Sequence, residues 1–482
     1  MPGKDIFYKK PVEQFGPEPG AGGYALKRAL GPFDLTMLGI GAIIGAGIFV
    51  ITGQAAAQYA GPGIVISFML SATACILAGL CYAEFASLIP AAGSAYTYAY
   101  AALGQIFAMI IGWDLVLEYL FAMSCVAVGW SGYVASFLKD FGIVIPAGLA
   151  ATPFDFSPTA GWHWTGGLVN LPAVLIIVLL TALVAAGIRE SAKANRVIVF
   201  IKMTAILLFI GFGIWYVSPQ NWTPFIPENT GEFGSFGWSG ILRGAGVVFF
   251  AYIGFDAVST AAQETRNPQR DMPVGILLSL GICTVFYILV ALILTGIIRY
   301  EYLNVPDPIA AGLNAVGPSL FWLRPIVKIG AIAGLSSVIL VQIIAMSRIF
   351  FAMSGDKLLP PFLSRVHPKF RTPHVATILT GAAAMVFAGL LPIGVLGELV
   401  SIGTLFAFTV VCISVLVLRK TNPSLHRPFR TPFYPLVPIL GAGTSILQMA
   451  GLPLGTWARF IIWFAIGMSI YFLYSRRMNR QN

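Results

Sequence analysis

Long apolar runs separated by short polar segments extend along almost the whole chain. A helix that crosses a bilayer needs roughly 20 mostly apolar residues. Twelve runs of about that length or longer occur, at 33–58, 62–89, 105–138, 169–187, 197–217, 239–262, 273–298, 322–353, 374–391, 395–418, 432–450 and 456–475. No segment between them is long enough for a soluble domain. The pattern predicts an all-α membrane protein with twelve transmembrane helices.

The composition supports this reading. Of 482 residues, 57% are hydrophobic and only 10% are charged, whereas soluble domains carry roughly 25% charged residues. An ordinary soluble enzyme is therefore excluded, and so is a disordered chain, which requires low hydrophobicity. The five cysteines lie inside apolar runs without a CxxC pair or a Cys/His cluster, which predicts neither a disulfide framework nor a metal site.

The net charge of +10 is unevenly distributed along the chain. If the N-terminus lies inside, 22 basic residues fall in segments on the inner side and six on the outer side. Such an excess of inner lysine and arginine sets the orientation of membrane proteins. We therefore expect a multi-pass protein of the plasma membrane with both termini cytoplasmic, and no nucleic-acid partner is needed to explain the charge.

The first run contains Gly39, Gly41, Gly45 and Gly47 near its middle. Each glycine costs about 1 kcal/mol relative to alanine in a helix. One explanation is close packing of helices through small residues. The other is an unwound segment, which is tolerated at that depth only where it lines a cavity. Its free amides would face an anion and its free carbonyls a cation.

The sixth run has a similar interior, with Gly244, Gly246 and Gly254 followed by Asp256. Paired interrupted segments in corresponding positions indicate an inverted-repeat transporter, and runs one and six are five apart. We therefore expect a 5+5 fold with unwound helices 1 and 6. The predicted parts are a cytoplasmic tail (1–32), a first repeat (33–217), an extracellular loop (218–238), a second repeat (239–420), two appended C-terminal helices (421–475) and a second cytoplasmic tail (476–482).

Several short motifs carry a family resemblance. They are Gly-Ala-Ile-Ile-Gly-Ala-Gly-Ile-Phe at 41–49, the segments 82–85 and 89–96, 250–256 with 263–268, 347–349 with 353–360, and 427–432. Together they resemble the amino acid–polyamine–organocation superfamily over nearly the whole chain. Segment 112–119 is most similar to its cationic amino acid transporter branch, whose mammalian members carry two more spans.

The resemblance implies a LeuT-like fold and a site for an α-amino acid at the two breaks. Backbone amides of Ile44, Gly45, Ala46 and Gly47 are expected to bind the carboxylate. Carbonyls near Ile43, Phe250, Ala251 and Ile253, beside Gly254, are expected to bind the ammonium group. In span eight, Leu335 is expected to form an apolar wall, which argues against strict cationic selectivity. Ser336 and Ser337 either face the pocket or bond carbonyls of their own helix.

Four candidate residues are charged and lie within or near span centres, namely Asp114, Glu118, Lys202 and Asp256. Since a charge at mid-membrane costs about 3 kcal/mol, a functional role is the default hypothesis. Lys202 either snorkels to the cytoplasmic face or, as the resemblance implies, replaces a sodium ion between helices one and eight. We expect Lys202, Glu118 and Asp256 to couple transport to protons.

Alternative roles remain for these acidic residues. Asp256 alternatively caps its interrupted helix, and Glu118 pairs with Lys202, lies near Asp256, contacts cavity water or touches a cationic substrate. A structural role is expected for Asp114. The motif match suggests that Glu84 braces the loop after its span.

These observations predict a secondary active importer of L-amino acids that works by alternating access, with protons as the coupling ion, no sodium and no cofactor. Alternatives on the same fold are an amino acid exchanger and a strictly cationic amino acid transporter. The absence of a P-loop disfavours ATP-driven transport, and a channel lacks its repeated pore loop or charged ring. No Ser/His pair suggests an enzyme, and no signal indicates an oligomer or a single-span partner.

Overall fold

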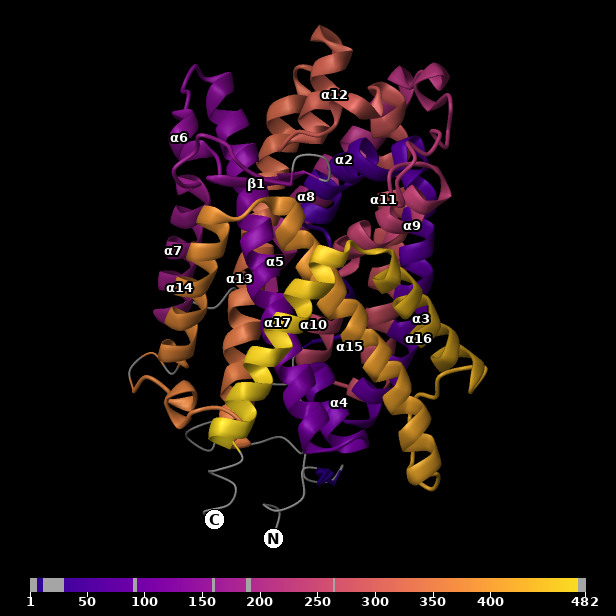
Figure 1. Cartoon of the computed structure of the whole chain (residues 1–482), viewed down its shortest axis with the longest axis vertical. Helices are drawn as coiled ribbons and strands as arrows, with labels where there is room; N and C mark the ends of the chain where they lie inside the picture. The colour runs from indigo at the N-terminus through magenta and orange to yellow at the C-terminus, as the bar shows by residue number, and fades with distance from the viewer. Residues whose placement is uncertain are drawn as a thin grey trace.

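The computed structural model of the chain describes residues 7–11, 30–89, 93–157, 161–187, 192–262, 265–368, 370 and 372–475. They form a bundle of long helices (Figure 1). The α-helices are α1 (Pro32–Ile43), α2 (Thr52–Ala55), α3 (Ile64–Leu88), α4 (Ser94–Ala102), α5 (Gln105–Asp140), α6 (Ala147–Ala150), α7 (Leu171–Ala185), α8 (Ala192–Gly213), α9 (Gly237–Val248), α10 (Phe255–Thr260), α11 (Pro268–Ile297), α12 (Pro308–Val316), α13 (Leu323–Gly355), α14 (His374–Leu390), α15 (Ile393–Thr421), α16 (Leu436–Gly451) and α17 (Leu454–Ile470). Two short antiparallel strands, β1 (Phe154–Ser157) and β2 (Gly161–Trp164), lie at one end of the bundle.

Each of the twelve predicted runs falls on one helix or on a series of helical segments. In the described residues, seven helical stretches are long and apolar enough to cross a membrane, and α1, α7, α14 and α16 are shorter apolar helices. Large apolar side chains such as Leu179 of α7 and Ile461 of α17 are more than half exposed on the outside of the bundle. Exposed apolar surface of this kind suits contact with lipid, and the chain is a helical membrane protein.

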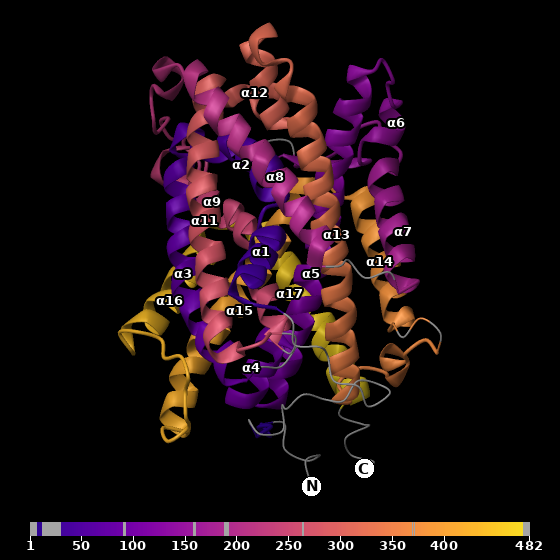
Figure 2. The same cartoon turned by 180° about the vertical axis from the view of Figure 1, so that it is seen from behind.

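Three pairs of packed helices join elements that are five runs apart. The second run (α3) packs on the seventh (α11), the third (α5) on the eighth (α13), and the fourth (α7) on the ninth (α14). The pair α7 and α14 stays side by side in both views (Figures 1 and 2). Small residues allow this close packing: a Cβ added to Gly381 of α14 would overlap Thr181 of α7.

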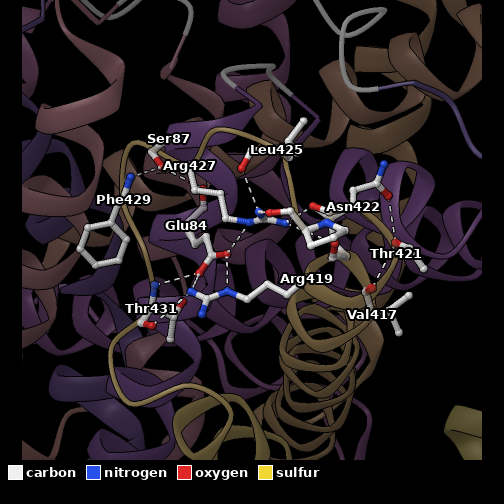
Figure 3. A network of polar contacts seen from close by, with 12 residues as sticks. Glu84, Ser87, Val417, Arg419, Thr421, Asn422, Leu425, Arg427, Phe429 and Thr431 are labelled. Carbon is white, nitrogen blue, oxygen red and sulfur yellow. Dashed lines mark hydrogen bonds and ion pairs between the residues drawn. The ribbon is translucent and has the colours of Figure 1, made fainter.

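A buried polar network joins the end of α3 to α15 and to the segment after it (Figure 3). Both oxygens of Glu84 accept hydrogen bonds from Arg419, at 3.0 and 2.6 Å, and Oε2 also accepts from the Thr431 amide at 2.8 Å. Nε of Arg427 lies 3.3 Å from Glu84 Oε1. The loop that Glu84 was expected to brace includes residues outside the described part of the chain. Its described partners belong instead to α15 and to segment 422–435.

We predict that Glu84→Gln destabilises the protein by about 2 kcal/mol, because it leaves two guanidinium groups beside a neutral and weaker acceptor. The midpoint of thermal unfolding in detergent should fall. Glu301→Gln is the control, since its ion pair with Arg299 is exposed and such pairs contribute about 0–1 kcal/mol. Equal midpoints for the two variants would show that the network does not hold segment 422–435.

Candidate functional site

The first predicted break lies between α1 and a short π-helical segment. α1 ends at Ile43, Ile44 has extended backbone angles (φ −73°, ψ 98°), and helical structure resumes as η2 (Gly47–Ile51), α2 and η3 (Ala56–Ala60). The Ile44 amide still donates to the Ile40 carbonyl at 3.0 Å, so this amide belongs to α1. Gly45, Ala46 and Gly47 begin the second half of the run, where the first amides of a helix lack intrahelical acceptors.

The second break is narrower than its glycine pattern suggested. α9 ends at Val248 and η7 (Phe249–Tyr252) follows, after which Ile253 is extended and α10 begins at Phe255. Gly254 supplies the turn with φ of +118°, in the left-handed region that glycine adopts readily. Gly244 and Gly246 lie within regular α9, where an added Cβ would meet Ser67 and the Gln448 carbonyl.

The two breaks touch each other at the centre of the bundle. A Cβ added to Gly254 would lie 2.8 Å from the Ala42 carbonyl, and one added to Gly47 would overlap Ala251. They enclose a cavity of about 10 Å³, lined by Ala42, Ile43, Gly45, Ala46, Gly47, Val126, Phe250, Ile253, Val338 and Gln342. That volume holds roughly one water molecule, so the central cavity is closed in this conformation.

Six of the ten predicted substrate-binding residues line this cavity, namely Ile43, Gly45, Ala46, Gly47, Phe250 and Ile253. Ile44, Ala251 and Gly254 lie beside it in the breaks. Leu335 is fully buried but is not among the lining residues, and α13 contributes Val338 and Gln342 instead. Ser336 and Ser337 donate to the Ile332 and Gly334 carbonyls of their own helix.

Gln342 is a lining residue that the motif comparison missed. The residue is 8% exposed, and its Oε1 has no hydrogen-bond partner. A buried amide oxygen without a partner is costly, which makes it a candidate ligand for a polar group. The sequence feature that could have identified Gln342 is its polar side chain within the apolar run 322–353.

Tyr287 of α11 was also missed, although it connects the two breaks. Its hydroxyl lies 2.9 Å from the Ile43 carbonyl and 2.6 Å from the Ala251 carbonyl. Both carbonyls were assigned to the substrate ammonium. One hydroxyl has a single proton to donate, so Tyr287 satisfies one of these two acceptors at a time.

Lys202 of α8 is fully buried and lies at the end of α1. Its Nζ donates to the Gly41 carbonyl at 2.5 Å and to the Ile44 carbonyl at 2.8 Å. Its stem packs on α13, where a Cβ added to Gly334 would lie 3.1 Å from Lys202 Cδ. The side chain therefore does not snorkel to the membrane surface but lies between α1 and α13.

Three buried carboxyl groups form an acidic cluster, which we define as Asp114 and Glu118 of α5 and Asp256 of α10. None is more than 1% exposed, and Glu118 interacts electrostatically with the other two. Tyr119 donates to Asp256 Oδ2 at 2.9 Å, while both Asp114 oxygens and Glu118 Oε1 have no hydrogen-bond partner. Asp256 was one of the expected neighbours of Glu118, and the structure places the two residues close together.

Paired interrupted helices around a buried cavity are the architecture of a membrane transport protein. Residues 30–475 match the family model described as amino acid permease. The chain belongs to the amino acid permease family, within the amino acid–polyamine–organocation superfamily.

Named relatives cover most or nearly all of the chain. The methylthioribose transporter of Bacillus subtilis (strain 168) is 49% identical over 477 residues, 99% of each chain. The branched-chain amino acid permease BcaP of the same organism is 45% identical over 478 residues, again 99% of each. Cationic amino acid transporter 4 of Homo sapiens is 34% identical over 431 residues, which are 89% of this chain and 65% of the human one.

We predict that Gly47→Ala weakens binding of radiolabelled L-alanine by about tenfold or more, because the added methyl group forces the two breaks apart. An equilibrium binding measurement by scintillation proximity assay on purified protein gives the affinity. The control is Gly281→Ala in α11, where an added Cβ meets nothing within 4 Å. If both variants elute as folded protein and bind equally, the contact between the breaks is not needed for binding.

Proposed function

We propose that the protein is a proton-coupled, sodium-independent importer of L-amino acids with twelve spans, a 5+5 inverted repeat and two cytoplasmic termini. The observation that carries this proposal is the contact of two interrupted helices around one buried cavity. Membership of the amino acid permease family supports the substrate class.

Helix packing supports the inverted repeat. A twofold relation between runs 1–5 and 6–10 would bring together equivalent runs, and α3 with α11, α5 with α13 and α7 with α14 are such pairs. The described residues nearest the termini share one end of the bundle, since both Tyr8 and Tyr471 interact with Tyr100. Placing that end in the cytoplasm agrees with the excess of basic residues on the same side.

Backbone groups of the breaks would recognise the amino acid. The outer half of the first run starts with Gly45–Gly47, and amides at a helix start attract a carboxylate. The Ile43 and Ala251 carbonyls would accept hydrogen bonds from the ammonium group, which has three protons and replaces the single proton of Tyr287. Such recognition reads the α-carbon substituents and leaves the side chain to the cavity wall.

The lining of the central cavity favours substrates with neutral side chains. Val126, Phe250, Ile253 and Val338 are apolar, Gln342 supplies a polar side chain, and none of the described lining residues is a carboxylate. A lysine or arginine head group would lack an anionic partner there, which is unfavourable in a buried site. The names of the relatives include branched-chain and cationic substrates. Selectivity between these two classes would therefore depend on the residues that line the central cavity.

We predict that unlabelled L-valine displaces radiolabelled L-alanine at about one tenth of the concentration that L-arginine requires. The reason is that the guanidinium group of L-arginine would be buried in the central cavity without an anionic partner. Val338→Ala should shift the ranking toward larger side chains by enlarging the cavity. Leu335→Met, on the same helix but outside the lining, is the control and should keep the wild-type ranking. Tighter binding of L-arginine than of L-valine would contradict the neutral preference.

Lys202 would couple the proton to the conformational change. A protonated Nζ donates to the carbonyls at the end of α1 while its stem contacts α13, much as a metal cation would collect oxygens. Loss of the proton removes these donations and allows α1 to separate from α13. The acidic cluster also lies within the spans and is buried, and its members Glu118 and Asp256 would be further proton carriers.

We predict that Lys202→Ala retains L-alanine binding within a few-fold but loses accumulation driven by a proton gradient, because the substrate contacts lie elsewhere. The measurement is uptake into liposomes with an imposed inward proton gradient, with and without sodium. Lys328→Met is the matched control, since Lys328 is also buried in the bundle but pairs with Asp140 at 2.6 Å.

Two outcomes would reject this mechanism. The first is a requirement for sodium, and the second is unimpaired accumulation by Lys202→Ala. Counterflow of L-alanine that is fast without any proton gradient, combined with no net accumulation when the gradient is present, would identify an exchanger instead.

A further inference from the structure

A second and much larger cavity opens toward the end of the bundle that carries α6, α12 and the β1–β2 hairpin (Figure 1). We call it the vestibule. Its volume is about 360 Å³, within the range of small-molecule sites. Its wall includes Ile51 to Tyr59 from the outer half of the first run, Ala150 to Phe156, Asn304 to Pro306, and Ile393 to Glu398 of α15.

One layer of apolar side chains separates the vestibule from the central cavity. A Cβ added to Gly129 of α5 would lie 3.0 Å from Val50, and 3.7 Å from both Ala46 and Ile393. Ala46 lines the central cavity, whereas Ile393 lines the vestibule. A solute that enters the central cavity from this side therefore first occupies the vestibule.

The lining of the vestibule is acidic and rich in amides. Among the described residues that line it, the charged ones are Asp155 and Glu398, and none is lysine or arginine. Four side-chain amides also line it, those of Gln54, Gln58, Asn170 and Asn304. A cavity of this kind attracts a cationic group and offers N–H donors to a carboxylate.

Glu398 is held in a fixed orientation at the vestibule wall. Its Oε2 accepts a hydrogen bond from Thr456 at 2.5 Å and lies 3.5 Å from Nη2 of Arg459. Both of these contacts go to Oε2. No hydrogen bond to Oε1 is described, and Oε1 is not one of the fully buried unpaired atoms, so it is accessible from the vestibule. One oxygen of a side chain that is only 5% exposed is thus anchored, and the other is available to a ligand.

We propose that the vestibule is a second amino-acid binding site, in which Glu398 Oε1 accepts a hydrogen bond from the ammonium group before the substrate passes the apolar layer. The Gln54 amide, for which no hydrogen bond is described, is placed on the same wall to donate to the carboxylate. This inference rests on the proposed function, because the ligand is the transported amino acid.

The test is the stoichiometry of radiolabelled L-alanine bound to the purified full-length protein at saturation. The wild type should bind two molecules per chain with different affinities. Glu398→Gln should weaken the vestibule site by about tenfold or more, since a hydrogen bond to a charged group is lost, and should leave the central site intact. Gly47→Ala should do the opposite, retaining only the vestibule site.

The chemistry of the site is tested with two fragments of L-alanine on the Gly47→Ala protein. L-Alaninamide keeps the ammonium group and should displace the remaining label, whereas propionate has only the carboxylate and should not. Gln54→Leu, on a side chain that is partly exposed, should weaken L-alanine at this site but not L-alaninamide. Equal effects of both fragments would overturn the role given to Glu398.

Arg459→Gln is the matched control, because it removes the ion pair of Glu398 while keeping the carboxylate. It should retain two sites, and a loss equal to that of Glu398→Gln would show that the pair only supports the fold. A single wild-type site that Gly47→Ala abolishes and Glu398→Gln leaves unchanged overturns the vestibule site but not the proposed function. Absence of any amino acid binding to the wild type rejects the proposed function itself.

Discussion

The structure depends on how the unpaired backbone groups of two broken helices are satisfied inside an apolar bundle. A carbonyl without a partner is costly away from water. Lys202 donates to the Gly41 and Ile44 carbonyls, and Tyr287 reaches those of Ile43 and Ala251. Both donors come from other helices, so the breaks exist only within the assembled bundle.

Under the proposed function, the same constraint would bring binding and conformational change to one place. The groups that stabilise the breaks are hydrogen-bond donors, as is the ammonium group of an amino acid. A substrate bound as proposed would compete with Tyr287 for carbonyls, and loss of the Lys202 proton would alter the contact of α1 with α13. Local chemistry at the breaks would in this way be connected to the positions of whole helices.

Around this centre, small residues and buried polar anchors determine which helices lie together. Gly39 faces Ser279 of α11, Gly47 faces Ala251, and Gly381 faces Thr181, each too closely for a further carbon atom. Close backbone approach of this kind is a main source of helix association in membranes. The Glu84 network adds a polar connection between α3 and α15 at the end of the bundle.

The sequence alone determined the helices and the two interrupted segments, because apolar runs of bilayer length and clustered glycines are local signals. It also identified Lys202 as unusual, since a lysine inside an apolar run carries a large desolvation cost. It did not distinguish glycines that break a helix from glycines that pack, such as Gly244 and Gly246, because both lower helix propensity alike.

Only the tertiary structure decided which side chains meet at the cavity. Val338 and Gln342 replace Leu335 there because the orientation of α13 depends on its packing against α5, and a nearly uniform apolar sequence does not specify which face turns inward. Tyr287 and the vestibule carboxylate Glu398 are far in sequence from the residues they join. Their roles follow from contacts between distant segments, and such contacts leave no local pattern in the chain.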